Sequence, residues 1–209
     1  MHIFRQFKQD DLNDIYTISV KTGDNGRDAT ALYDELKLMG HIYSAPYMLL
    51  EPELAIVVEY NDQIVGYVVG TRDTQRWQTR LEREWWPALR DQYKAPNPAN
   101  RDHWTMDEIR IDRLHTPRLV DQEISKRFPA HLHMNLLPAM QRRGIGTALL
   151  QKWLSIAMKE GDCGVHVGAN PKNTDGIAFW QRSGFETIRT APDKTPQAGW
   201  LGRSSMKTA

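Results

Sequence analysis

The segment 141–147, QRRGIGT, combines features that are typical of an anion-binding loop. It follows an apolar run, and a helical pattern of apolar residues begins directly after it. The first amides of a helix lack intrahelical partners and lie at the positive end of the helix dipole. Gly144 and Gly146 let the backbone turn sharply and approach a ligand closely. The loop therefore predicts a site for a di- or triphosphate-like group.

The glycine spacing excludes two other kinds of phosphate loop. A Walker loop needs a glycine, four residues and then Gly-Lys-Ser or Gly-Lys-Thr, and the chain lacks this motif. The dinucleotide fingerprint needs a third glycine and an acidic residue at the end of a second strand, and both are missing here. The simpler alternative for these residues is a strand-to-helix turn with solvated arginines.

Histidines form a second group that could do chemistry, in the segment 130–138, AHLHMNLLP. Strand alternation places its apolar residues on one face and His131, His133 and Asn135 on the other, unless a β-bulge exchanges the faces. Imidazole accepts a proton near neutral pH, so either histidine is a candidate general base, and a structural role is the alternative. A metal site with His166 is geometrically conceivable, but the chemistry expected below needs no metal, and we predict none.

The composition limits the function classes. Hydrophobic residues make up 40% of the 209 residues, enough for a packed core, and Cys163 is the single cysteine, so no internal disulfide forms. The formal net charge of +1 argues against a nucleic-acid protein that binds by bulk electrostatics. No apolar run reaches the roughly 18–20 residues that span a bilayer, and the first residues do not resemble a secretory signal. We therefore expect a cytoplasmic protein.

Elements that position these residues follow from periodicity and turn signals. The clearest is a hairpin over 53–71 that turns at Asn61 and Asp62. Strand–helix–strand order in the last third implies parallel strands, so the sheet is mixed and the fold is mixed α/β. No linker divides the chain, and we predict one domain, 1–209. The other predicted helices lie at 10–23, 31–47 (closed by Gly40 or Pro46), 73–93, 147–159 and 174–184. The other predicted strands lie at 1–7, near 106–112 and at 130–137, 163–170, 185–190 and 199–207.

The loop and a second block, NTDGIAFWQRSGF at 173–185, together resemble the GCN5-related N-acetyltransferases, the GNAT superfamily. The loop is similar to the family's Gln/Arg-x-x-Gly-x-Gly/Ala motif, and the block to its Asn…Ala…Tyr…Gly-Phe segment. This resemblance implies a mixed central sheet that is splayed between the fourth and fifth strands, with helices on both faces. It makes 72–128 an insertion between the third and fourth strands. FPAHLHMNLLP, GVHVGAN, WLGRSS and LEREWWPAL more narrowly resemble the acetyltransferase-like domain of O-GlcNAcases and its free-standing bacterial relatives.

The resemblance implies acetyl-CoA as co-substrate. Backbone groups at the end of the fourth strand would bind the pantetheine arm, and loop amides the pyrophosphate. A helix cap is the alternative for Asn173, and core packing for the aromatic residues. The residues expected to bind the cofactor are Leu136, Leu137, Gln141, Arg142, Arg143, Gly144, Ile145, Gly146, Thr147, Asn173, Phe179 and Trp180.

The catalytic residues stay unassigned. Trp180 stands where many members of the family have a tyrosine that protonates the leaving thiolate, and an indole N–H is not a proton source near neutral pH. Family members with a base on the fourth strand place it on the face that is apolar here. The inserted segment carries four tryptophans, which form either a lid over the acceptor or helix packing. The loop 22–30 either holds the acceptor or is a polar turn. The four tryptophans are Trp77, Trp85, Trp86 and Trp104.

The function expected from these features is acetyl transfer from acetyl-CoA to a primary amine by direct attack. An acyl-CoA-binding module with little or no catalysis is the main alternative, because Trp180 and the unassigned base weaken the case for an enzyme. An interaction domain that has lost its cofactor is a third, which the intact loop disfavours. The acceptor is a small-molecule or peptide amine. We expect no nucleic-acid or membrane partner, and a homodimer is left open.

Overall fold

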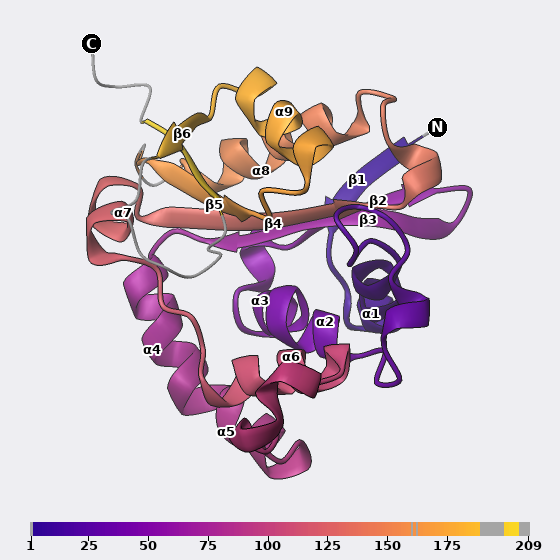
Figure 1. The fold of residues 1–209 in the computed structure, drawn as a ribbon. Helices are drawn as coiled ribbons and strands as arrows, with labels where there is room; N and C mark the ends of the chain where they lie inside the picture. The colour runs from indigo at the N-terminus through magenta and orange to yellow at the C-terminus, as the bar shows by residue number, and fades with distance from the viewer. Residues whose placement is uncertain (1, 160, 162, 189–198, 205–209) are drawn as a thin grey trace.

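The computed structural model describes residues 2–159, 161, 163–188 and 199–204. In this part of the chain, seven strands form one sheet with the order β1-β2-β3-β4-β5-β7-β6 (Figure 1). β4 and β5 are parallel, and every other neighbouring pair is antiparallel, which confirms the predicted mixed sheet. The strands are β1 His2–Gln6, β2 Ile56–Tyr60, β3 Gln63–Thr71, β4 Ala130–Leu136, β5 Val165–Ala169, β6 Glu186–Ile188 and β7 Gly199–Arg203.

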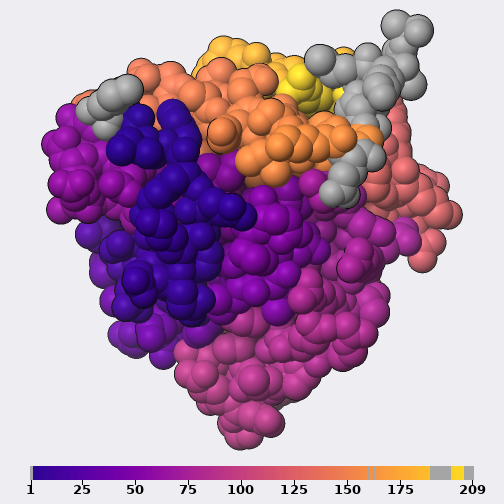
Figure 2. Space-filling model, turned by 180° about the vertical axis from the view of Figure 1, so that it is seen from behind, coloured from indigo at the N-terminus to yellow at the C-terminus, as the bar shows by residue number. Residues whose placement is uncertain are grey.

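Helices cover both faces of the sheet, as predicted. α8 and α9 lie on one face and α1 to α6 on the other, and each layer encloses its own apolar core (Figure 1). From behind, α5 and α6 lie in the tapered lower end of the molecule (Figure 2). The helices are α1 Leu12–Lys21, α2 Leu38–Tyr43, α3 Ala45–Leu50, α4 Thr74–Glu84, α5 Trp86–Gln92, α6 Met106–His115, α7 Gln122–Arg127, α8 Ile145–Ala157 and α9 Thr174–Arg182.

The strand predicted near 106–112 is wrong, because this segment is helix α6. Thr105 and Glu108 form a capping box: the Thr105 hydroxyl accepts from the Glu108 amide, and the Glu108 carboxylate accepts from the Thr105 amide. This reciprocal pair satisfies two backbone donors at the start of a helix and fixes where it begins. The capping-box residues are visible in the sequence, but the alternation of apolar and charged residues over 106–112 favoured a strand.

Prolines divide two of the predicted helices. The helix predicted over 73–93 breaks between α4 and α5, where Pro87 occupies the first turn of α5. The helix predicted over 31–47 is wrong in its first part, since a 3₁₀ turn at Thr30–Leu32 precedes α2. Pro46 does not end a helix but lies in the first turn of α3. Proline lacks an N–H and is tolerated only in the first turn of a helix, so each proline starts a new one.

β4 carries the geometry that matters most. Its register with β3 is unbroken from Leu136 to His131, so no bulge exchanges the faces of β4. β4 pairs with β5 only at Ala130–Val165 and His131–His166, although both strands continue beyond these pairs. The two strands therefore splay apart, as predicted. The predicted strand residues 189–190 and 205–207 lie outside the described residues.

Candidate active site

The predicted phosphate loop connects β4 to α8 and ends in a helix start built on glycine. Gly144 adopts φ 76°, a conformation that glycine reaches without strain, and α8 begins at Ile145, two residues earlier than predicted. The first intrahelical bond runs from Ala148 N to Gly144 O at 3.1 Å. The amides of Ile145, Gly146 and Thr147 consequently have no intrahelical acceptor and are available to an anion.

Side chains of the loop mostly serve to hold it. Gln141 Nε2 donates to Leu136 O at 3.0 Å and to Gly26 O at 3.1 Å, and so ties the loop to the end of β4 and to the segment 22–30. Arg142 pairs with Asp175 at 3.1 Å, but both side chains are more than four-fifths exposed, so the pair adds little stability. The groups that the loop offers to a ligand are therefore mainly backbone amides.

The open edge of β4 offers a second set of backbone groups. Leu137 N donates to Val65 O on the β3 side at 3.0 Å, so this predicted amide is not available to a ligand. Hydrogen-bonded and non-bonded pairs alternate along an antiparallel ladder, so the polar backbone groups of Leu136 and Met134 point away from β3. They face the gap that β5 has left. Met134, rather than Leu137, accompanies Leu136 at this edge.

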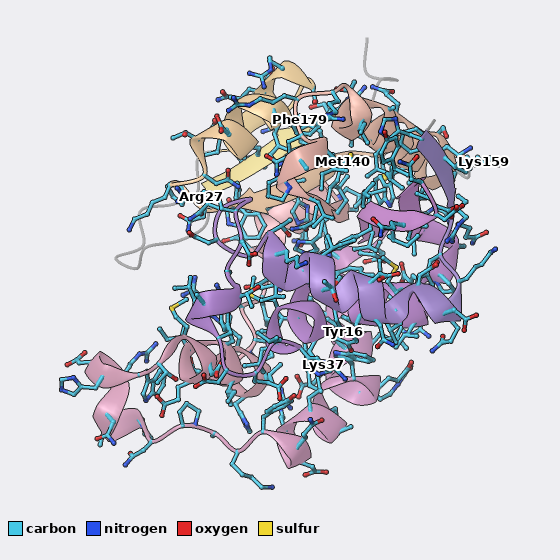
Figure 3. All side chains as sticks on the ribbon, turned by 90° about the vertical axis from the view of Figure 1, so that its right-hand side faces the viewer. Tyr16, Arg27, Lys37, Met140, Lys159 and Phe179 are labelled. Carbon is cyan, nitrogen blue, oxygen red and sulfur yellow. The ribbon has the colours of Figure 1, made fainter. Side chains whose placement is uncertain are left out.

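α9 closes the site with aromatic side chains. Asn173 caps this helix, since its Oδ1 accepts from Gly176 N at 2.9 Å. Phe179 packs closely against Gly146 of the loop. A β-carbon at position 146 would lie only 3.3 Å from Phe179 Cε2. Figure 3 shows Phe179 and Met140 on the same side of the sheet. Trp180 is 9% exposed, and its ring centroid lies 5.0 Å from that of Phe179, so it is both a core residue and a wall of the cleft.

On the opposite face of β4, the imidazole of His131 is saturated by hydrogen bonds. Its Nε2 lies 2.7 Å from the Tyr47 hydroxyl and its Nδ1 2.7 Å from the Thr74 hydroxyl. The Thr74 hydroxyl donates to Pro129 O at 2.7 Å, so Nδ1–H donates to Thr74, and Nε2 accepts from Tyr47. Neither nitrogen is left for a proton, a substrate or a metal. His131 is therefore a structural histidine.

The other two histidines keep free nitrogens. His133 is half-buried and forms no hydrogen bond with any described residue, and its ring lies against Tyr43 and Tyr47 at 5.7 and 5.4 Å between centroids. His166 Nδ1–H donates to Phe128 O at 2.7 Å, which leaves its buried Nε2 unpaired among the described residues. Burial, together with His166, lowers the pKa of His133 to about 4, and burial lowers the pKa of His166 to about 4. Both rings are thus neutral at pH 7.

One cleft of about 2040 Å³ joins the two faces. The loop, α9 and the splayed strand ends line it on one side, and the histidines and helices α4 to α6 line it on the other. Trp77 and Trp86 belong to its wall, whereas Trp85 and Trp104 do not. Trp77 is also 1% exposed and packs in the core, so it has the structural role expected from its helical spacing. The loop 22–30 reaches the cleft through Thr22 and Gly26, among others.

Several residues of this second wall were missed in the sequence. Tyr43 and Tyr47 flank a short break between α2 and α3, and Arg110 and Arg113 lie on a helix that the sequence predicted as a strand. A correct assignment of α6 would have placed the two arginines on one helix face. The tyrosines and the arginines are distant from β4 in the sequence, and only the tertiary fold brings them close to it.

Across residues 2–159, 161, 163–188 and 199–204, no helix is long and apolar enough to cross a membrane. Over the same ranges, no group of three or more His, Cys, Asp or Glu side chains is arranged to hold a metal ion.

A mixed sheet that opens between two parallel strands, beside a helix start with free amides, resembles the cofactor site of acetyl-CoA-dependent acetyltransferases. Residues 10–185 match the model of the acetyltransferase (GNAT) family. The chain therefore belongs to the GNAT family, whose members are N-acetyltransferases that take their acetyl group from acetyl-CoA.

Individual relatives agree with this assignment. An uncharacterized N-acetyltransferase of Methanocaldococcus jannaschii, MJ1207, is 37% identical over 79 residues, which are 37% of this chain and 32% of that protein. The match thus spans about a third of this curated relative. The crystal structure of SsHAT shares 35% identity with a TM-score of 0.88 and covers 97% of this chain and 98% of that one. The PaiA N-acetyltransferase of Thermoplasma acidophilum, solved with coenzyme A, shares the fold at 14% identity and a TM-score of 0.56, with 98% and 99% covered.

Proposed function

We propose that this chain transfers an acetyl group from acetyl-CoA to a primary amine by direct attack of the amine on the thioester. The observation that carries the proposal is the cleft that crosses the sheet where β4 and β5 diverge. It connects the free amides at the start of α8 to a pocket on the opposite face. A cofactor bound at those amides can extend along the edge of β4 and present its thioester to that pocket.

Backbone groups supply most of the cofactor contacts in this proposal. The amides of residues 145–147 hold the pyrophosphate, and the Leu136 amide and the polar backbone groups of Met134 bind the pantetheine arm and polarise the thioester carbonyl. Trp180 walls the thioester end. Holding the amine and the thioester together supplies much of the rate, because effective molarities of oriented groups are high.

His133 is the proton acceptor that the geometry favours. The amine nitrogen attacks the carbonyl carbon, the carbon–sulfur bond breaks, and the proton released by the amine passes to His133. Its ring faces the pocket side of β4, is neutral at pH 7 and has no competing hydrogen bond among the described residues. His131 cannot take this role, since both of its nitrogens are engaged. The CoA thiolate leaves without an acid from position 180.

An acyl-CoA-binding module without catalysis is the second candidate. The observation that favours it is Trp180, which replaces the family's usual proton donor. The two candidates share cofactor binding and differ only in turnover.

The test separates binding from turnover. Thermal unfolding with acetyl-CoA at about 100 times its Kd should show a stabilisation of about 2.7 kcal/mol, which for a chain of this length raises Tm by roughly 5–10 °C. A panel of primary amines is then screened for release of the free CoA thiol. Stabilisation with no thiol release from any amine would select the binding module, and no stabilisation would contradict both candidates.

A further inference from the structure

The acceptor side of the cleft contains arginines that the proposed transfer does not use. Arg110 and Arg113 lie one turn apart on α6, and Arg118 follows shortly after this helix, and all three line the cleft. Arg110 and Arg113 are half-buried and Arg118 is exposed. None of the three forms an ion pair with a carboxylate among the described residues.

Arg110 is held in place with hydrogen-bond donors to spare. Its Nε donates to the Tyr33 hydroxyl at 2.9 Å and its Nη1 to the Tyr43 hydroxyl at 3.2 Å. A guanidinium has five N–H donors, so three remain after these bonds. Tyr43 in turn packs against His133, at 5.7 Å between ring centroids. Tyr43 therefore connects Arg110 to His133, beside which we propose that the acetyl group is transferred.

Arg113 has no hydrogen bond to any described residue. Like charges three residues apart on a helix repel each other, and removing a guanidinium from water carries a further cost. Burial, followed by Arg118 and Arg110, lowers the pKa of Arg113, while Tyr43 and Asp112 oppose the shift. The charge of this group is thus poorly compensated within the described part of the chain.

Two of the nearby carboxylates are committed elsewhere, and Asp112 forms no ion pair with Arg113. Asp107 Oδ2 accepts from the amides of Asp34 and Glu35, and Glu108 caps the start of α6. The cleft itself is lined by two carboxylates among the described residues, and both are paired with arginines of their own. These pairs are Glu82–Arg90 and Asp175–Arg142.

We propose that Arg110 and Arg113, assisted by Arg118, bind an anionic group of the acceptor, so that the amine substrate also carries a carboxylate or a phosphate-like group. This inference rests on the proposed function. Guanidinium groups bind both kinds of anion through paired hydrogen bonds. Tyr43 would orient the substrate between the anion and His133. The pocket then disfavours a strongly basic peptide, whose side chains would meet three uncompensated positive charges.

The experiment compares acceptors of similar length that differ in charge. kcat/KM is measured by CoA release with 4-aminobutyrate, 3-aminopropylphosphonate, the neutral 4-aminobutanamide and 1,4-diaminobutane. The parent should prefer the carboxylate or the phosphonate over the neutral amide by about tenfold or more, since a charge-assisted bond contributes about that factor. Which anion is the better substrate distinguishes a carboxylate from a phosphate-like acceptor.

Variants then assign the preference to Arg113. Arg113→Gln should lower the ratio of anionic to neutral kcat/KM about tenfold, and Arg113→Lys should restore part of it. Arg101→Gln is the matched control, since Arg101 lies on the same inserted segment, stacks on Trp104 and does not line the cleft. Thermal unfolding verifies that each variant is folded. An unchanged ratio in Arg113→Gln, or a parent that prefers 1,4-diaminobutane, would overturn the proposal and leave acetyl transfer intact.

Binding provides a readout that does not depend on turnover. Calorimetric titration of 4-aminobutyrate and of 3-aminopropylphosphonate into CoA-saturated protein should show binding of at least one anion that Arg113→Gln weakens about tenfold. Absence of binding by both anions would contradict the proposal even for an inactive protein. The Kd for acetyl-CoA should be the same in parent and Arg113→Gln. If it rises tenfold in the variant, the arginines hold the cofactor phosphates and the proposal is wrong.

Discussion

The two sides of β4 present different kinds of groups. On the α8 side, where we propose that the cofactor binds, these are backbone amides of residues 145–147 and of the β4 edge, all within one short stretch. On the other side, they are side chains from four separate segments: Tyr43, Trp86, Arg110 and His133. The first site depends on backbone conformation and the second on tertiary convergence. Substitutions should therefore act on cofactor binding and on acceptor chemistry independently.

The largest expected effect tests the cofactor side alone. Gly146→Asp should weaken acetyl-CoA binding by about 10³-fold or more, because a carboxylate beside the pyrophosphate sets like charges together, which costs several kcal/mol. Isothermal titration measures the Kd, and circular dichroism verifies the fold.

Gly146→Ala separates charge from bulk at the same position. An added Cβ lies 3.3 Å from Phe179 Cε2 and 3.5 Å from Leu136 Cδ1, so small shifts accommodate it. We expect a loss of affinity well below that of the aspartate variant. A folded Gly146→Asp protein that binds acetyl-CoA like the parent would show that the pyrophosphate lies elsewhere.

The second-largest expected effect is on catalysis at the acceptor side alone. His133→Gln should lower kcat by about 100-fold, since removal of a general base typically costs 10²–10⁴-fold, while the Kd for acetyl-CoA stays within a few fold. His103→Gln, an exposed histidine outside the cleft, is the control. If His133→Gln retains the kcat of the parent, His133 is not the proton acceptor, and water or another group removes the proton. If it loses acetyl-CoA affinity equally, the two sides are not independent.

This separation also explains what the sequence could and could not predict. The glycine loop and α8 were accessible, because the glycines and the helix periodicity lie close together in the chain, and the splay was implied by the resemblance to the family. The pocket on the opposite face was not accessible, because its side chains converge from separate segments and one of these, α6, was predicted as a strand. His131 and His133 looked equivalent in the sequence. Only their partners distinguish them, since Tyr47 and Thr74 engage the first and leave the second free.

A third prediction concerns stability on the acceptor side. Burial lowers the pKa of His41, His133 and His166 to about 4, and that of His131 well below 6.5. These imidazoles bind protons in the unfolded state before they do in the folded one. The stability that the folded state gains from keeping these imidazoles neutral is therefore fully present above about pH 6.5. This contribution is lost as the pH falls toward 4. Each such imidazole, when fully buried, lowers the unfolding free energy by about 2 kcal/mol between pH 7 and pH 5, so we expect a total loss of several kcal/mol.

Urea unfolding at the two pH values measures this change. His166→Asn should reduce the loss, since it removes one buried imidazole, whereas His103→Gln should leave it unaltered because His103 is exposed. Equal stability at pH 7 and pH 5 would mean that the buried histidines take up protons without unfolding the pocket. Independence of the two sides further predicts the same pH dependence in Gly146→Asp.

The smallest expected effect concerns Trp180, which lines the cleft and packs in the core on the α8 side. Trp180→Tyr adds a phenol at the family's donor position, and general acid catalysis would accelerate turnover by about 10²–10⁴-fold if loss of the thiolate limited the rate. The smaller ring also leaves a gap between Phe179 and Phe185, at a packing cost of about 1 kcal/mol. A CoA thiolate is already a fair leaving group, so we expect turnover to change by less than about tenfold.

The comparison is kcat for the parent, Trp180→Tyr and Trp180→Phe with one good acceptor. A gain of 100-fold or more in the tyrosine variant alone would mean that the parent lacks an acid it needs. It would then favour the acyl-CoA-binding module over the transferase.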